Sequence, residues 1–241
     1  MLKKVMNSCQ FVYDNSHWVK INYEKIKELI LPINNTHWLQ NNPYGILNLD
    51  IDNLINFILV YHSIGFSFWG NPKWTIATPE GNLDGSYALM YLLLNKTIDN
   101  PNFLNFNYLS NISLDEFKKL LEGNVEIPLL IDRYNNLISL SEVVSNKMNN
   151  NFYNYIKDIN NDEDLFSIII NEFPDVFNDI SNYKGKTIFL YKLAQLITSD
   201  ILHVKQIKEK ALVDYSHIVG CADYKIPQIL RNLGILEFHP A

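Results

Sequence analysis

The segment 187–208 carries apolar residues at the spacing of one helix face, and this pattern constrains the fold of the 241-residue chain more than any other feature. The residues of this stripe are Leu190, Leu193, Ala194, Ile197, Ile201 and Val204. Apolar residues that recur every three or four positions favour an amphipathic helix, which must bury its stripe against other elements. The sequence therefore predicts a helical core.

Further helices are predicted from periodicity and from signals that mark helix ends. Pro32 and Pro174 end two of them, Asp50 or Asp52 caps a third, and Gly234 follows the last. These helices span 23–31, 50–64, 87–94, 164–173 and 227–233. Ser113 and Ser139 each stand three residues before a glutamate, the spacing of a capping box that starts a helix.

Strand signals are weak and confined to 66–69, 74–77 and 127–131. The sequence shows no internal repeat and no long linker, and its hydrophobic content of 47% is ample for a packed core. We therefore expect an all-α fold, mainly helical with a few short strands, formed by a single domain over residues 1–241.

The net charge of −6 argues against a large nucleic-acid interface. A protein that binds the phosphate backbone normally presents a basic face whose lysines and arginines displace counterions. Two lysine clusters remain, at 184–192 and 205–210, and the second is typical of a solvated helix face. We expect no direct binding to nucleic acid, whereas a small anionic ligand is left open.

Apolar segments and cysteine spacing indicate the cellular location and the need for cofactors. No apolar run reaches the length of a membrane span, and the N-terminus lacks the apolar segment of a secretory signal. Cys9 and Cys221 lie far apart without metal-ligand spacing, which favours two free thiols over a disulfide. We expect a cytoplasmic protein without metal or cofactor, of open oligomeric state.

Three aspartates in the last third of the chain have neighbours that predict burial. Asp179, Asp200 and Asp223 are flanked by aromatic and aliphatic residues in segments that otherwise resemble core helices. Carboxylates are rarely buried unless they are paired or used, so these residues indicate a pocket for a polar ligand.

Several short motifs occur in the order found in the queuosine salvage protein family. They are GFSFW at 65–69, DGSYAL at 84–89, IPLL at 127–130, FP at 173–174, FND at 177–179, YKGK at 183–186, YKLAQ at 191–195 and ADYKIPQILR at 222–231. The chain resembles this family over about residues 16–236.

The resemblance implies hydrolysis of the N-glycosidic bond of queuosine 5′-monophosphate, with or without activity on queuosine. The released queuine would re-enter tRNA modification. An all-helical fold similar to the helix-hairpin-helix DNA glycosylases is also implied. Such a reaction passes through an oxocarbenium-like state, so it needs a carboxylate near the sugar and a proton for the departing base.

Two aspartates are the catalytic candidates that follow from this resemblance. Asp223, beside Tyr224 on a turn before Pro227, is the candidate for the carboxylate that stabilises or attacks the sugar. Asp179 is the candidate for reading the base or binding the protonated amine of queuine, with Phe177 stacking on the ring. As an alternative, Asp223 caps the following helix.

Further substrate-binding candidates have structural alternatives of their own. Asp200 shares either catalytic role or forms a salt bridge with Lys192 or Lys205. Lys192 binds the phosphate or pairs with Asp200. His37 contacts the ligand or packs beside its neighbouring tryptophan. Asp84 is a weaker candidate, because it also suits a helix cap.

The aromatic residues Trp69 and Tyr87 are assigned to the core, since alternating aromatic residues around 66–69 usually indicate packing. Two arginines of the family are replaced here by Leu193 and Asn178, so a nucleoside or another 7-deazaguanine derivative stays open as substrate. An alternative function is a nucleic-acid base glycosylase, disfavoured by the acidic charge. Another is a non-catalytic helical interaction module whose aspartates only cap and pair.

Overall fold

The computed structural model describes residues 2–29, 37–40, 42, 44–100, 102–221 and 223–239, and helices dominate it. The helices are α1 (Leu2–Asn15), α2 (Tyr23–Glu28), the short 3-10 helix η1 (Ile46–Asn48), α3 (Ile51–Ile64), α4 (Gly85–Asp99), α5 (Phe106–Leu109), α6 (Leu114–Leu120), α7 (Leu130–Lys147), α8 (Phe152–Ile156), α9 (Asp162–Glu172), α10 (Pro174–Phe177), α11 (Lys192–Glu209) and α12 (Lys225–Asn232). The strands pair antiparallel: β1 (Val19–Ile21) with β6 (Leu236–Phe238), β2 (Thr75–Thr78) with β3 (Gly81–Asp84), and β4 (Ile180–Tyr183) with β5 (Lys186–Phe189). The expected mainly helical fold is confirmed.

Helix α3 forms the centre of the core. Every residue from Leu54 to Ile64 is buried, and a helix buried on all faces belongs to a protein interior. It packs against α4, α7, α8 and α11. Asp50 caps its first turn by accepting a hydrogen bond from the backbone N–H of Asn53 at 2.9 Å, as the sequence predicts.

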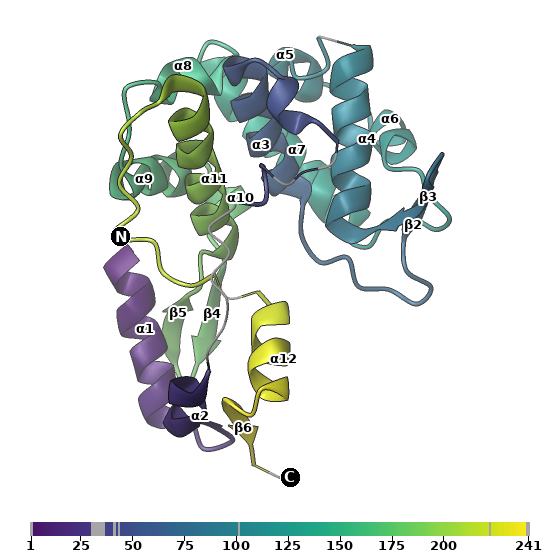
Figure 1. Cartoon of the computed structure of the whole chain (residues 1–241). Helices are drawn as coiled ribbons and strands as arrows, with labels where there is room; N and C mark the ends of the chain where they lie inside the picture. The colour runs from purple at the N-terminus through teal and green to yellow at the C-terminus, as the bar shows by residue number, and fades with distance from the viewer. Residues whose placement is uncertain are drawn as a thin grey trace.

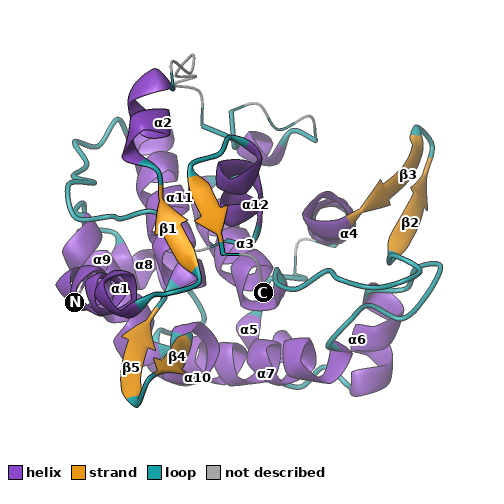
Figure 2. Cartoon of the chain, turned by 90° about the horizontal axis from the view of Figure 1, so that it is seen from below, coloured by secondary structure: helices purple, strands orange, loops and turns teal. Residues whose placement is uncertain are grey.

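The elements form two parts, a larger and a smaller one. Figure 1 shows most helices, from α3 to α9 together with α11, gathered above a smaller part that holds α1, α2, α12 and β4 to β6. Figure 2 shows the β2–β3 hairpin at the opposite end of the molecule from the β4–β5 hairpin. The smaller part is tied together because α1 packs on β5 and because β1 pairs with β6.

The helix expected over 187–208 begins later than predicted, at Lys192, because residues 187–189 belong to β5. Lys184 and Gly185 both have positive φ, 49° and 78°, as a two-residue hairpin turn requires. This turn pairs residues 180–183 with residues 186–189. Residues 187–189 are Thr, Ile and Phe, which favour strands, so the turn and the composition together were the missed signal.

Other predicted boundaries shift in an informative way. Ser113 forms the predicted capping box with Glu116, whereas Ser139 lies inside α7 and starts no helix. Helices α4, α9 and α12 begin at residues 85, 162 and 225, each two residues before the predicted start. Segments 66–69 and 127–131 are fully described and are not strands. Helix α2 ends at Glu28, and Pro32 lies outside the described residues.

Candidate functional site

The fold brings together the three aspartates that the sequence singles out. Asp179 follows α10, Asp200 lies on α11, and Asp223 precedes α12. Burial raises the pKa of the Cys221 thiol, and the charges of Lys192 and of all three aspartates also act on that thiol. The four charged groups therefore lie around one region of the molecule, although they come from segments up to 44 residues apart.

Lys192, the first residue of α11, contacts two of the aspartates through different atoms. Its Nζ lies 2.8 Å from Oδ2 of Asp223. Its backbone N–H donates to Oδ2 of Asp179 at 3.0 Å, so Asp179 also stabilises the start of α11. The other oxygen of Asp223 accepts a hydrogen bond from the backbone N–H of Lys225 at 2.9 Å. Asp223 thus supports the start of α12 and pairs with Lys192 at the same time.

The carboxyl groups of Asp179 and Asp223 differ in how readily they bind a proton. Burial raises the pKa of Asp179, and its Oδ1 is buried without a hydrogen-bond partner among the described residues. Burial also acts to raise the pKa of Asp223, but hydrogen bonds from Lys192 and Lys225 outweigh it and the pKa is lowered. Asp223 is therefore a stable anion, whereas Asp179 is the more easily protonated acid.

Asp200 has a different set of partners from those expected. Its side chain is almost fully buried, and Oδ2 lies 2.7 Å from Nε2 of His62. Its Oδ1 accepts a hydrogen bond from Nε1 of Trp38 at 2.8 Å and lies 3.2 Å from Nε2 of His37. Burial acts to raise the pKa of Asp200, but the hydrogen bonds from His37 and His62 outweigh it and lower the pKa. The predicted salt bridge with Lys192 or Lys205 is wrong.

His37 faces Asp200 in a fixed tautomer. Its Nδ1 accepts a hydrogen bond from the backbone N–H of Leu39 at 3.3 Å, so the ring proton is assigned to Nε2, which points at Asp200. The ring also stacks on His203 with centroids 3.9 Å apart. This arrangement agrees with a packed histidine, and ligand contact by His37 stays a prediction.

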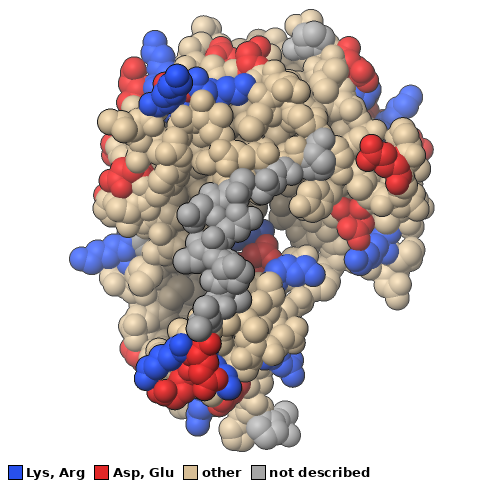
Figure 3. Space-filling model, in the orientation of Figure 1, with Lys and Arg blue, Asp and Glu red and all other residues tan. Residues whose placement is uncertain are grey.

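A cavity of about 280 Å³ opens beside these groups. It is lined by Trp38, Tyr61, His62, Gly65, Ser86, Tyr87, Met90, Lys192, Leu196, Asp200 and Asp223. Figure 3 shows this side of the molecule hollowed between its two parts, with acidic and basic side chains at the hollow. Carboxylates and a lysine on an otherwise mostly apolar wall are typical of a site for a polar organic ligand.

Two aromatic assignments from the sequence are wrong. Trp69 and Tyr87 are each 56% exposed, so neither belongs to the core. The ring of Trp69 lies against that of Tyr224 with centroids 4.4 Å apart, and Tyr87 borders the cavity from the first turn of α4. Phe177 shows the opposite behaviour. Its ring is fully buried against Phe173, which leaves no exposed face for the predicted stacking on a ligand.

The segment that carries Trp69 is organised by a buried arginine that sequence reasoning missed. Arg133 on α7 is fully buried and donates hydrogen bonds to the carbonyls of Ile64, Phe66, Ser67 and Pro128. Its guanidinium also lies 4.6 Å and 4.7 Å from the ring centroids of Phe66 and Phe68. These contacts explain why the alternating aromatic motif forms an ordered loop.

Lys205 and Asp84 also differ from their simplest interpretations. Lys205 is fully buried and donates to the carbonyls of Ile156, Lys157 and Ile159, so the expected solvated face is wrong for this residue. Asp84 precedes α4, and its carboxylate pairs with Lys73 at 2.9 Å. His62, Trp38 and Arg133 were not predicted as site or support residues, because their partners are distant in sequence.

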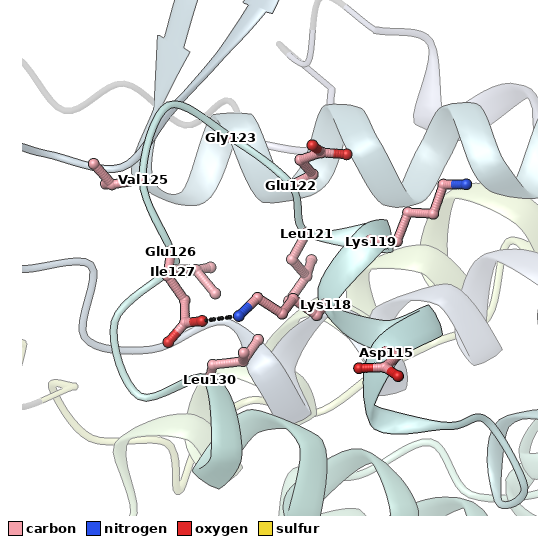
Figure 4. A pocket seen from close by; sticks show the side chains of 10 residues that line it. All are labelled: Asp115, Lys118, Lys119, Leu121, Glu122, Gly123, Val125, Glu126, Ile127 and Leu130. Atoms are coloured by element: carbon pink, nitrogen blue, oxygen red, sulfur yellow. Dashed lines mark ion pairs between the residues drawn. The ribbon is translucent and has the colours of Figure 1, made fainter.

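A larger pocket lies elsewhere and has a different character. Its volume is about 480 Å³, and residues 115–130 alone line it. Figure 4 shows Lys118 and Glu126 facing each other, and these side chains form an ion pair at 2.5 Å. Because this pair neutralises its own charge and none of the three aspartates is present, the smaller cavity is the better candidate for chemistry.

The fold and the site define a mainly helical protein with a carboxylate-lined cavity. The family model described as queuosine salvage protein matches residues 47–241, and the chain belongs to this family. The resemblance inferred from the sequence motifs is thus confirmed.

Curated relatives carry the name queuosine 5′-phosphate N-glycosylase/hydrolase. The relative from Sphaerobacter thermophilus is 33% identical over 190 residues, which cover 78% of this chain and 58% of the relative. The Nematostella vectensis relative is 30% identical, with coverages of 78% and 56%. The Mus musculus relative is 26% identical, with coverages of 96% and 72%. The chain therefore spans less than two thirds of the length of the first two relatives.

Three further findings concern the described part of the chain. Cys9 and Cys221 are free thiols, in agreement with the sequence. No described helix combines the length and apolar character needed to cross a membrane. No cluster of three or more His, Cys, Asp or Glu side chains suited to a metal ion occurs within these residues.

Proposed function

We propose that this protein hydrolyses the N-glycosidic bond of queuosine 5′-monophosphate and releases queuine for salvage into tRNA modification. The observation that carries the proposal is the joint contact of Lys192 with Asp179 and Asp223 beside a cavity. Family membership and the names of the curated relatives support the same reaction.

The chemical roles follow from the different charge states of the two aspartates. Asp223 is held as an anion by Lys192 and lines the cavity, so it suits the stabilisation of positive charge that develops on the sugar. Asp179 does not line the cavity itself but contacts Lys192, which does, and it has a raised pKa and an oxygen without a described partner. We assign it proton transfer with the attacking water or the departing base. Lys192 has a second function in this proposal, which is to attract the substrate phosphate.

We infer that residues 1–241 act as one hydrolase domain, which is supported by a core cluster that includes residues from Val5 to Val204. Similarity of the fold to helix-hairpin-helix DNA glycosylases, a cytoplasmic location and the absence of direct nucleic-acid binding stay predictions. The oligomeric state is open.

The test is chromatographic detection of free queuine after incubation with queuosine 5′-monophosphate and, separately, with queuosine. We expect release by the wild type, and a rate at least about 100-fold lower for Asp223→Asn, since a lost catalytic carboxylate typically costs about 100-fold to 10,000-fold. The ratio of the two wild-type rates reports the preference for the phosphate.

The matched control is Asp175→Asn, because Asp175 is an exposed aspartate on α10 outside the cavity. It should keep wild-type activity. Thermal unfolding of all variants checks that each is folded. A folded wild type that releases no base from either substrate would contradict the proposed reaction, whereas an active Asp223→Asn would contradict only the role of Asp223.

A further inference from the structure

The side chain of Gln195, in the first turn of α11, is fully buried and uses both ends of its amide. Its Nε2 donates a hydrogen bond to the backbone carbonyl of Leu190 at 3.1 Å. Its Oε1 accepts a hydrogen bond from the backbone N–H of Val219, also at 3.1 Å. Gln195 therefore joins two segments that lie far apart in the sequence, one just before Lys192 and one shortly before Asp223.

The first of these segments is a turn with an unusual backbone. Tyr191 has a φ of 48°, in the left-handed region that bulky residues rarely adopt and that persists only where the surroundings hold it. On one side, the backbone N–H groups of Leu190 and Tyr191 donate to the carbonyl of Asp179 at 3.1 Å and 3.2 Å. On the other side, Gln195 binds the Leu190 carbonyl through its side chain and the Tyr191 carbonyl through its backbone N–H. The turn that places Lys192 is thus held from both sides.

The second segment, residues 217–219, is held by buried side chains along its length. Three successive backbone N–H groups of this segment donate to such side chains. Asp162, at the start of α9 and fully buried, accepts the first two at 2.7 Å and 2.9 Å, and Gln195 accepts the third. Asp223 comes four residues after this segment. The placement of residues 217–219 therefore limits where Asp223 can lie.

The ion pair between Lys192 and Asp223 does not explain the approach of the two segments by itself. Both side chains are partly exposed, and ion pairs that water reaches contribute little to stability. The two hydrogen bonds of the Gln195 amide are shielded from water, and breaking them would leave a buried carbonyl and a buried N–H unsatisfied. The amide therefore holds the segments together more firmly than the ion pair does.

On the basis of the proposed function, we infer that Gln195 is a positioning residue for the pair formed by Lys192 and Asp223. Its amide sets the distance between the turn before Lys192 and the segment before Asp223, although Gln195 does not line the cavity. A neutral amide suits this role because it carries a donor and an acceptor on one planar group. Small displacements of catalytic groups are costly, since an error of about 1 Å can lower a rate about 100-fold.

The experiment measures kcat and KM for queuosine 5′-monophosphate in two variants. Gln195→Met keeps the length of the side chain but removes both hydrogen bonds. It should lower kcat about tenfold or more with a smaller change in KM, because Asp223 is proposed to act on charge that develops in the transition state. Gln195→Glu regains one donor and one acceptor when its carboxyl group is protonated. The ratio of its kcat to the wild-type kcat should therefore rise about threefold or more between about pH 8 and about pH 5, whereas the ratio for Gln195→Met should stay constant.

A second measurement follows the geometry without catalysis. Cys9→Ser leaves Cys221 as the single thiol of the chain, and Cys221 lies between the segment 217–219 and Asp223. In this background, Gln195→Met should raise the rate at which a thiol reagent labels Cys221 about fivefold or more, because the released segment opens more often. The matched control is Thr198→Val, one turn further along α11. Thr198 is also fully buried, but its hydroxyl donates to the carbonyl of Ala194 within the same helix, at 2.7 Å.

All measurements are made well below the thermal unfolding midpoint of each variant, so that general destabilisation does not imitate the effect. Thr198→Val should keep kcat and the labelling rate of Cys221 within about twofold of the wild type. A folded Gln195→Met with the kcat and labelling rate of Thr198→Val would overturn the positioning role and leave the proposed reaction intact. A folded wild type that releases no base would overturn the proposed reaction, and the labelling of Cys221 would still decide whether Gln195 holds the two segments together.

Discussion

At the scale of single residues, Asp179 combines a hydrogen bond that holds the start of a helix with a second carboxylate oxygen that has no hydrogen-bond partner among the described residues. Its Oδ2 is engaged by the backbone N–H of Lys192, and its Oδ1 is buried without a partner among the described residues. Burial raises its pKa, so protonation begins at a higher pH than for an ordinary aspartate, whose pKa is about 3.9. These properties support the proposed role of Asp179 in proton transfer.

This shift predicts a pH effect on catalysis. If the ionised form of Asp179 is required, kcat/KM falls as the pH decreases through the raised pKa. Asp179→Asn should lower kcat/KM at pH 7 by about 100-fold or more and should remove this acid limb from the residual activity. The measurement is the pH dependence of kcat/KM for both proteins. An acid limb of the same midpoint in Asp179→Asn would assign it to another group.

The raised pKa of Asp179 also makes the stability of the folded protein depend on pH in a defined direction. A raised pKa means that the folded protein binds the proton more tightly than the unfolded chain. The contribution of the Asp179 carboxyl is therefore most favourable at acid pH and is lost as the pH rises through the raised pKa. Asp223 behaves in the opposite sense, because its pKa is lowered and its contribution is lost on acidification. At neutral pH the buried carboxyl of Asp179 therefore makes its least favourable contribution to stability.

At the scale of elements, the loop after α3 depends on Arg133 of α7. Its guanidinium donates hydrogen bonds to four backbone carbonyls, including those of Ile64 and Phe66. None of these four hydrogen bonds goes to a carboxylate. Burial lowers the pKa of Arg133 to about 10, which still leaves it charged at neutral pH. The loop carries Trp69, so α7 indirectly positions one wall of the pocket that Trp69 lines with Tyr87 and Tyr224.

Replacing this arginine should therefore destabilise the fold. Arg133→Met removes all four donors, and unsatisfied buried carbonyls cost about 1–3 kcal/mol each, partly offset by the lost cost of burying a charge. We expect the free energy of unfolding, measured in urea, to fall by about 3 kcal/mol. Arg231→Met, at an exposed arginine on α12, should change it by less than about 0.5 kcal/mol. Equal stability of the two variants would show that the hydrogen bonds of Arg133 contribute little to the free energy of unfolding.

At the scale of the whole molecule, the net charge of −6 bears on the form of substrate that is accepted. A polyanion such as tRNA is repelled by an acidic protein, whereas a mononucleotide carries little charge, and the proposed function places its phosphate near Lys192. The cavity of about 280 Å³ is also far too small to enclose a tRNA. We therefore propose that overall charge and pocket size together favour a mononucleotide over intact tRNA.

We predict that queuine is released from queuosine 5′-monophosphate at least about 100-fold faster than from intact queuosine-containing tRNA, because an acidic surface disfavours the backbone. The measurement is queuine release from equal amounts of tRNA before and after digestion to 5′-mononucleotides. Digestion should restore the fast rate. Equal release from intact tRNA would favour the base-glycosylase alternative.

Much of the helical framework was determined by the sequence alone, because local signals specify it. Asp50 and Ser113 mark the starts of α3 and α6 through side-chain hydrogen bonds to residues three positions away. The grouping of Asp179, Asp200 and Asp223 was also predicted, since carboxylates amid apolar neighbours indicate burial. Motif order identified the family for the same reason, as it is a property of the linear chain.

Only the tertiary structure decided which groups are partners. Asp200 meets His62 and Trp38 rather than a lysine, Lys192 meets Asp223, and Trp69 leaves the core to contact Tyr224. The β4–β5 hairpin likewise replaces the expected first turn of α11. Each of these outcomes depends on contacts between segments far apart in the chain or on pairing across a turn. Local periodicity and composition do not encode these contacts, because the side chains meet only when the packed elements bring distant segments together.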